Sequence, residues 1–491
     1  MRAAARVSCR LAILALGASP GAGHAEDLRA ALAAAYAANP TLAAARETLR
    51  ATDEGVAIAR ADGLPSASAS VSETENLVQS QLSLGDAPRA LALAGTLSVP
   101  VYSGGAVRNG MKAADRRVLA GRADLAGSES GLFAQVVAAY MDVRLGEETL
   151  RLNRAEVETL RQTQRATADR FHVGEVTKTD LAQAQARLAL AEGSLRSAEA
   201  NLVQARETYG QLVGHAPAAL ADPPPLPGLP ASVEEAEAHA LADNPDLAAA
   251  RERSRAAAYD TRAAGAARLP KVSLFADAGY SDYLGGLKVL GYPSAAFPQS
   301  FTSADVGVRA TIPLYQGGRP GAQIRQAEAR EGAAQDNEIA AERQVIAQLR
   351  SAYASWQAAR AIIAYNETAV AAARLGLQGV RAENGVGNRT VLDILNAEQE
   401  LVSAQVQLAT ARRNAYVAGF SVLAAMGRAG ARDLGLDGGA LYDPALHYRQ
   451  MRRSLGDAPG HQGASAPPQP ASTPARTTVD TPPQTGTIEG G

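Results

Sequence analysis

Two long stretches of the chain repeat apolar residues at helical spacing and contain no proline. They extend from Gly105 up to Ala216 and from Gly321 up to Pro444, the next proline. Each stretch has one break rich in turn and capping residues, VGEVTKTD in the first and VGNRTVLD in the second. Each is therefore predicted to fold as a helical hairpin, and a first arm of about 65 residues would reach roughly 100 Å.

The returning arm of the first hairpin shows a heptad pattern. Leucines recur every seven residues, each followed three residues later by an alanine, at Leu181, Leu188, Leu195, Leu202, Ala184, Ala191, Ala198 and Ala205. The same register in the second half carries small or aliphatic residues from Ile394 to Ala425. Small residues on such a seam let helices approach closely, so we expect coiled-coil packing in both hairpins.

Before each hairpin, two segments alternate apolar and polar residues. They cover residues 66–72 and 91–99 in the first half and residues 272–280 and 304–312 in the second. Alternation predicts β-strands of about the length that crosses a bilayer, although a small soluble sheet with one solvated face gives the same pattern. Four membrane strands are too few to close a barrel, so a barrel would be shared by several chains.

The two halves of the chain share a motif. The segments NPTLAAARETLR and NPDLAAARERSR, 205 residues apart, agree at nine of twelve positions. We therefore expect two structural repeats, residues 26–215 and residues 232–428. A proline-rich linker at residues 216–231 would join them.

Both ends of the chain have distinctive composition. Residues 1–25 have the features of a signal peptide, with three arginines, the short apolar run LAILALGA and small residues before a cut after Ala25. The single cysteine, Cys9, would be removed with this segment, so the mature chain would have neither disulfides nor a lipid-anchor cysteine. Export favours the membrane interpretation of the strands. At the other end, residues 456–491 are predicted to be disordered because they are rich in Pro, Ala, Thr and Gly.

Composition also argues against several classes of function. The 48 basic and 50 acidic residues leave no basic excess for a nucleic-acid partner. The histidines are scattered without a metal-ligand spacing, and GGRPG lacks the lysine of a phosphate-binding loop. We expect no enzyme, no cofactor and no metal.

Together these features resemble the TolC-type outer-membrane channels of tripartite efflux pumps and type I secretion systems. The duplicated NPxLAAAR, the pair SVPVYSGG and TIPLYQGG, and the two hairpin turns carry the resemblance. It implies a homotrimer with a periplasmic tunnel of helices, an α-barrel, and one shared β-barrel of twelve strands, four from each chain. Residues 429–455 would lie in an equatorial belt around the tunnel. The implied partners are a periplasmic adaptor protein, an inner-membrane pump of ABC or RND type, and outer-membrane lipid.

The resemblance further implies a constriction at the periplasmic end of the tunnel. Asp393 matches one aspartate of the family's aperture ring and Asn396 replaces the other, so the ring would carry about half the charge and select cations less strongly. Arg389, Thr179 and Asp180 match the polar links that hold this end closed, whereas Asn384 replaces the family's tyrosine. Ordinary helix capping and surface pairing are the alternative for all these residues.

The tips of the two hairpins resemble the segments that touch the adaptor protein. They consist of Val173, Gly174, Glu175, Val386, Gly387 and Asn388. A glycine at a tip lets another backbone approach closely, although the turn alone explains each glycine equally well.

The sequence thus predicts the outer-membrane exit duct of a tripartite export system. Type I protein secretion is favoured over multidrug efflux, the alternative, because the mature chain lacks a lipid-anchor cysteine. An exported coiled-coil protein without a pore is the alternative of another class.

Overall fold

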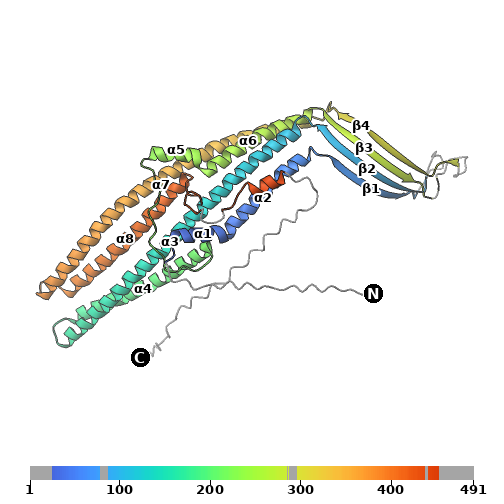
Figure 1. The fold of residues 1–491 in the computed structure, drawn as a ribbon. Helices are drawn as coiled ribbons and strands as arrows, with labels where there is room; N and C mark the ends of the chain where they lie inside the picture. The colour runs from blue at the N-terminus through green and yellow to red at the C-terminus, as the bar shows by residue number, and fades with distance from the viewer. Residues whose placement is uncertain (1–24, 78–86, 285, 287–295, 437–440, 453–491) are drawn as a thin grey trace, which may run out of the picture.

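The molecule is elongated, with helical hairpins at one end and a β-sheet at the other (Figure 1). The computed structural model describes residues 25–77, 87–284, 286, 296–436 and 441–452. The predicted disordered tail, and the predicted signal peptide apart from Ala25, lie outside the described residues.

The order of the elements confirms the internal duplication. The first half contains α1 (Leu28–Ala38), α2 (Pro40–Ala61), β1 (Ser66–Glu75), β2 (Arg89–Tyr102), α3 (Ala106–His172) and α4 (Lys178–Val213). The second half contains α5 (Val233–Asp243), α6 (Pro245–Gly265), the 3-10 turn η1 (Ala266–Arg268), β3 (Lys271–Asp282), β4 (Ser300–Thr311), α7 (Arg319–Gly385) and α8 (Val391–Ala425). A short helix, α9 (Leu446–Met451), follows.

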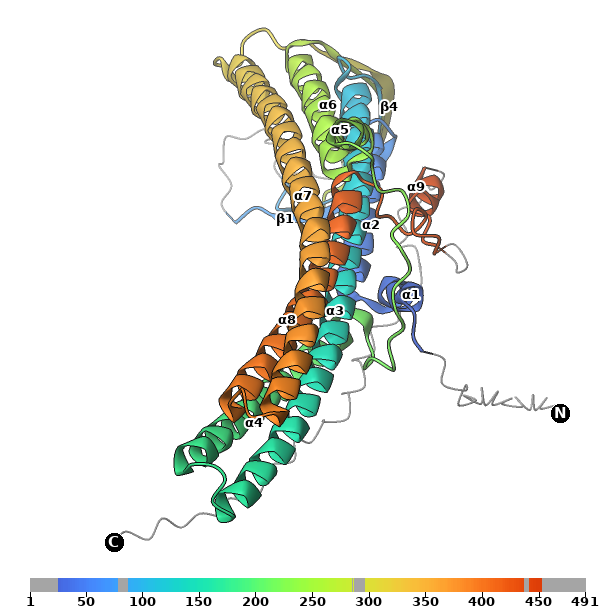
Figure 2. The same ribbon diagram turned by 90° about the vertical axis from the view of Figure 1, so that its left-hand side faces the viewer.

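The two helical hairpins lie side by side (Figure 2). Their first arms, α3 and α7, contain 67 residues each, which corresponds to about 100 Å. The predicted seam is confirmed, because Ala184, Ala191 and Ala198 of α4 are buried where this helix packs on α3. None of the described helices has the length and the apolar character that crossing a membrane requires.

The four strands form one antiparallel sheet in the order β1-β2-β3-β4. The pairing of β2 with β3 shifts between Pro100 and Tyr102, so the proline, which has no N–H to donate, lies at an irregularity of the ladder. Alternate residues of β3 and β4 make one face apolar, with Val272 opposite Ala310, Leu274 opposite Val308 and Ala276 opposite Val306. Val306 and Val308 are largely exposed, so none of the described residues covers this face at β4.

The duplicated asparagine joins the start of one helix to the end of another. Asn39 caps α2 by accepting two backbone N–H groups (2.9 and 3.4 Å), and its side-chain amide donates to the carbonyl of Leu212 at the end of α4 (3.0 Å). Asn244 caps α6 in the same way and donates to the carbonyl of Ala425 at the end of α8 (2.9 Å). The same motif occurs twice because each half needs the same joint.

The C-terminal helix α9 docks on the first half. His447 Nδ1 lies 3.2 Å from Asp53 Oδ2, and the hydroxyl of Tyr448 donates to Asp115 Oδ1 at 2.7 Å. Asp53 is buried, and burial raises the pKa of its carboxyl. These contacts attach the chain after α8 to α2 and α3.

Candidate channel aperture

The turns at the ends of the two hairpins have the same backbone geometry. Gly174 (φ +80°) and Gly387 (φ +81°) adopt the left-handed conformation that other residues rarely accept. Apart from its two chain neighbours, no described residue has an atom within 4 Å of a Cβ placed at either position. Beside them, Val173 and Val386 are 72% and 73% exposed. Each tip therefore needs its glycine for the turn and also presents an open, partly apolar surface.

A capping box begins each returning helix. Asp180 Oδ2 accepts from the N–H and the hydroxyl of Thr177 at 2.9 and 2.7 Å. Asp393 Oδ2 accepts from the N–H and the hydroxyl of Thr390 at 2.9 and 2.8 Å. The hydrogen bonds from the Thr390 backbone and hydroxyl lower the pKa of Asp393, so its carboxylate is ionised at neutral pH. The predicted aperture residue is thus also the third helical residue of a capping box, whose N-cap is Thr390.

Arg389 is paired within its own hairpin. Its Nε donates to Glu383 Oε2 at 2.8 Å, and this hydrogen bond raises the pKa of Arg389. The side-chain amide of Asn384 donates to the carbonyl of Arg389 at 2.7 Å and so holds the turn. Thr179 and Asp180, the other predicted link residues, lie in the first turn of α4.

Arg187 of α4 connects the first hairpin to the second. Its Nη2 donates to Asn396 Oδ1 at 2.7 Å, and its Nη1 donates to Gln399 Oε1. Because the planar guanidinium donates to two acceptors one turn apart on α8, these hydrogen bonds fix the orientation of the Arg187 side chain relative to α8. Asn396, which was predicted to line the aperture, is held by the neighbouring hairpin.

A buried carboxylate lies next to this link. Glu398 of α8 accepts from Arg381 Nη2 at 2.7 Å, and its side chain is 7% exposed. Its second oxygen, Oε2, is buried without a hydrogen-bond partner among the described residues. Burial raises the pKa of Glu156 on α3, and the negative charge of Glu398 raises it further. The positive charge of Arg187 lowers it. We call Glu156, Arg187, Arg381, Asn396 and Glu398 the inter-hairpin cluster.

The sequence matches one family profile in both structural repeats. That family is described as "Outer membrane efflux protein", and the matched segments are residues 31–215 and 238–428. The chain belongs to the outer membrane efflux protein family. Its members are transport channels, and membership locates the chain in the outer membrane.

Related outer membrane efflux proteins come from several bacteria. The chain is 35% identical over 427 residues to the outer membrane efflux protein BepC of Brucella suis, a match that covers 87% of this chain and 91% of BepC. It is 31% identical over 288 residues to the alkaline protease secretion protein AprF of Pseudomonas aeruginosa, covering 57% and 58% of the two chains. It is 29% identical over 315 residues to the outer membrane protein TolC of Escherichia coli, covering 62% of each.

Solved structures of outer membrane channels share the fold. The Campylobacter jejuni CmeC outer membrane channel matches with a TM-score of 0.73 at 17% identity, over 88% of this chain and 90% of that one. A structure of CusC matches with a TM-score of 0.70 at 19% identity, over 82% and 92%. At these identities the likeness concerns the fold alone, and it confirms the predicted fold class.

The sequence of this outer membrane efflux protein located the two turns but not the inter-hairpin cluster. Asn384 lies in the last turn of α7, Arg389 in the connecting turn and Asp393 in the first turn of α8, and their roles in an aperture stay predictions. Arg187 and Glu398 were missed. One signal was available for Glu398, because a charged residue directly follows the seam residue at position 397.

Proposed function

We propose that three copies of this outer membrane efflux protein form the exit duct of a tripartite export system. After removal of residues 1–25, the strands of three copies would form one barrel of twelve strands in the outer membrane. The hairpins would continue it as a tunnel through the periplasm, narrowed at its end by Asp393 of each copy. An adaptor protein would contact the tips, and an inner-membrane pump of ABC or RND type would load the duct. No step of this function is catalytic.

The open edges of the sheet are the observation that carries the proposal. Among the described residues, β1 pairs only with β2 and β4 only with β3, so each edge strand has one free side. An unpaired backbone group in hydrocarbon costs roughly several kcal/mol, and membrane barrels begin at about eight strands. Pairing β4 of one copy with β1 of the next satisfies both edges.

The exposed face of α7 supports the same assembly. Although α3 and α7 have equal lengths, α3 buries twenty residues and α7 buries seven. Apolar side chains of α7 that are 47–75% exposed include Ile339, Ile362, Tyr365 and Leu375. Because α7 lies at one edge of the chain (Figure 2), a hairpin of a neighbouring copy would cover this face of α7 from Ile339 onward.

For the cargo, we propose unfolded protein delivered by a type I secretion pump. The relatives AprF and the proteases secretion protein PrtF of Dickeya chrysanthemi are named for the secretion of proteases. Multidrug efflux is the second candidate, supported by BepC, which is named an efflux protein and matches over 91% of its length.

Electron microscopy of detergent-extracted protein tests the duct. We expect a threefold hollow tube at least roughly 100 Å long. A solid rod, or a monomer that needs no detergent, would contradict the proposal.

Gene deletion tests the cargo separately. Loss of a secreted protein with unchanged drug susceptibility supports type I secretion. Increased drug susceptibility with normal secretion would instead support multidrug efflux.

A further inference from the structure

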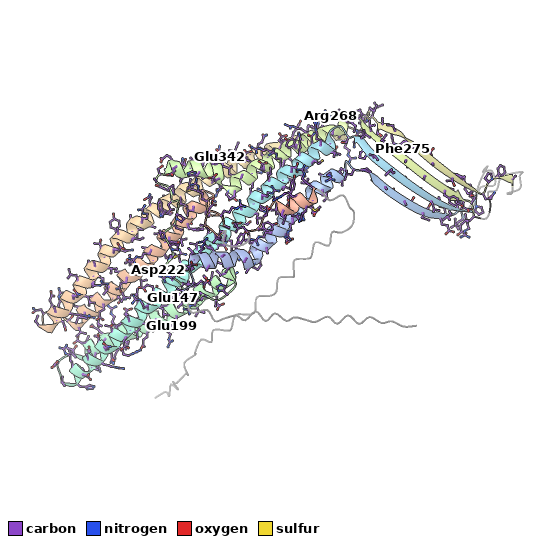
Figure 3. The ribbon with its side chains drawn as sticks, viewed as in Figure 1. Glu147, Glu199, Asp222, Arg268, Phe275 and Glu342 are labelled. Atoms are coloured by element: carbon purple, nitrogen blue, oxygen red, sulfur yellow. The ribbon has the colours of Figure 1, made fainter. Side chains whose placement is uncertain are left out.

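Two arginine side chains converge where the helices meet the sheet. Arg268 ends η1, just before β3, and Arg325 lies near the start of α7. Figure 3 shows Arg268 at this junction. A Cβ placed on Gly321 would lie 3.4 Å from Arg325 Nη1 and 3.5 Å from Arg268 Nη2. Both guanidinium groups therefore lie over the same bare stretch of backbone, and we call Arg268, Gly321 and Arg325 the arginine pair site.

The arginine pair has no acidic partner on the described part of the chain. Nearby arginines do have one, since Arg116 pairs with Glu252 and Arg117 with Asp260. Arg268 and Arg325 are exposed and make no ion pair with any described residue. Two like charges held together repel each other unless an anion lies between them. The geometry thus calls for an external anion.

The level of the site along the molecule indicates which anion is present. The last residue of β4, Thr311, pairs with Lys271, the first residue of β3, so the site lies at one end of the strands. Directly after β4, the side chains of Ile312, Leu314 and Tyr315 are 62%, 92% and 89% exposed. Exposed apolar and aromatic residues at the ends of membrane strands are typical of the boundary between hydrocarbon and headgroups. Phospholipid phosphates lie at this boundary.

The arginine pair site lies on the opposite side of α7 from the hollow between the helices. Gln323, Ala327 and Arg330 line a hollow together with alanines of α6. At about 100° per residue, Gly321 and Arg325 project from the other face of α7. The pair is therefore reached from one surface of the molecule and not through the hollow.

We propose that Arg268 and Arg325 bind the phosphate of an anionic phospholipid in the periplasmic leaflet of the outer membrane. A guanidinium matches phosphate oxygens with two parallel hydrogen bonds, and the missing side chain at Gly321 leaves room for those oxygens. The inference rests on the membrane insertion of the sheet that is proposed above. It adds a lipid site that anchors each copy at the junction of barrel and tunnel.

Native mass spectrometry of the full-length mature protein tests this site. The protein is released from detergent with either phosphatidylglycerol, which is anionic, or phosphatidylethanolamine, which is zwitterionic. The double substitution Arg268→Ala and Arg325→Ala is expected to lower the preference for phosphatidylglycerol by roughly thirty-fold, since two basic charges near the membrane are lost. Gly321→Leu should also lower it without changing any charge, and Arg343→Ala, an exposed arginine farther along α7, should leave it unchanged.

Two results would overturn the lipid site. One is an unchanged lipid preference in the double variant. The other is binding of inorganic phosphate to the wild type with no preference for phosphatidylglycerol, which would identify free phosphate as the ligand. The same spectra report the number of copies, so a failure of the trimer is distinguished from a failure of the lipid site.

Discussion

Arg187 Nη2 on α4 donates to Asn396 Oδ1 on α8 at 2.7 Å, which joins the returning arms of the two hairpins. The two residues are 209 positions apart in the sequence. If this end of the tunnel opens by separating the hairpins, the bond must break. It is therefore a candidate for the contact that holds the duct closed.

Replacing Arg187 should make the duct open more easily. Arg187→Ala removes the donors to both Asn396 and Gln399. One charge-assisted hydrogen bond contributes about 1.5–3 kcal/mol, so we expect the open probability in planar-bilayer recordings to rise by at least roughly ten-fold. Arg196→Ala is the matched control, because Arg196 lies on the same helix and pairs with Glu199 of that helix. Equal open probability in both variants would exclude a closing role for Arg187.

Asp393 should set the ion preference of the aperture. Asp393→Asn removes the charge and keeps an oxygen that can accept from Thr390. We expect the ratio of cation to anion permeability to fall by roughly two- to ten-fold in asymmetric salt. Asp180→Asn changes the equivalent capping box of the first hairpin and should have a smaller effect. Similar effects of the two substitutions would show that Asp393 acts only as a helix cap.

The joint at Asn244 should contribute to stability in two separable ways. Asn244→Ser keeps a helix cap but is too short to reach the Ala425 carbonyl, whereas Asn244→Ala loses both interactions. We expect local unfolding of α6 to become easier by about 1 kcal/mol in the serine variant and about 2 kcal/mol in the alanine variant. Hydrogen exchange of the amides at the start of α6 measures both values. Equal losses in the two variants would contradict a separate contribution from the bond to Ala425.

Acid should strengthen the contact between the hairpins through Glu156. Burial raises the pKa of this carboxyl above its ordinary 4.5, as does the charge of Glu398. A raised folded-state pKa gives stability that is fully present below the ordinary value and lost as pH rises through the folded value. The melting temperature should therefore fall between pH 4.5 and pH 7, and Glu156→Gln should reduce that fall.

Glu158→Gln is the control for the pH experiment. Glu158 is an exposed neighbour on α3, 3.7 Å from Arg161. Its substitution should leave the pH dependence as in the wild type. A Glu156→Gln variant with the wild-type pH profile would exclude the carboxylate as its source.

The hairpin tips should be needed for transport but not for the pore. Leucine at positions 174 and 387 adds bulk where the chain leaves open space and also strains a left-handed backbone. Asparagine tolerates this backbone better, so the asparagine double variant controls for strain. We expect the leucine variant to lose export while keeping conductance. Export at the wild-type level would argue against an adaptor contact at the tips.

The parts of the fold with local periodicity could be predicted from the sequence. Ala184 and Ala191 lie seven residues apart, and both are buried as the heptad requires. The two hairpin turns could also be predicted, because Gly174 and Gly387 each lie close in sequence to helix-capping residues. No local sequence pattern, in contrast, predicts the role of Arg187, since its acceptors come from a helix more than 200 residues later. Such contacts depend on how the two hairpins pack against each other, and the local sequence of one hairpin does not predict that packing.

The equal lengths of α3 and α7, 67 residues each, constrain how this protein can change. Because the two first arms have equal lengths, the six arms of a trimer would end at about the same level. An insertion of one heptad into a single half would lengthen three arms by about 10 Å and leave the other three behind. A longer or shorter tunnel therefore requires matched insertions or deletions in both halves, so the internal duplication limits how the length of the tunnel can evolve.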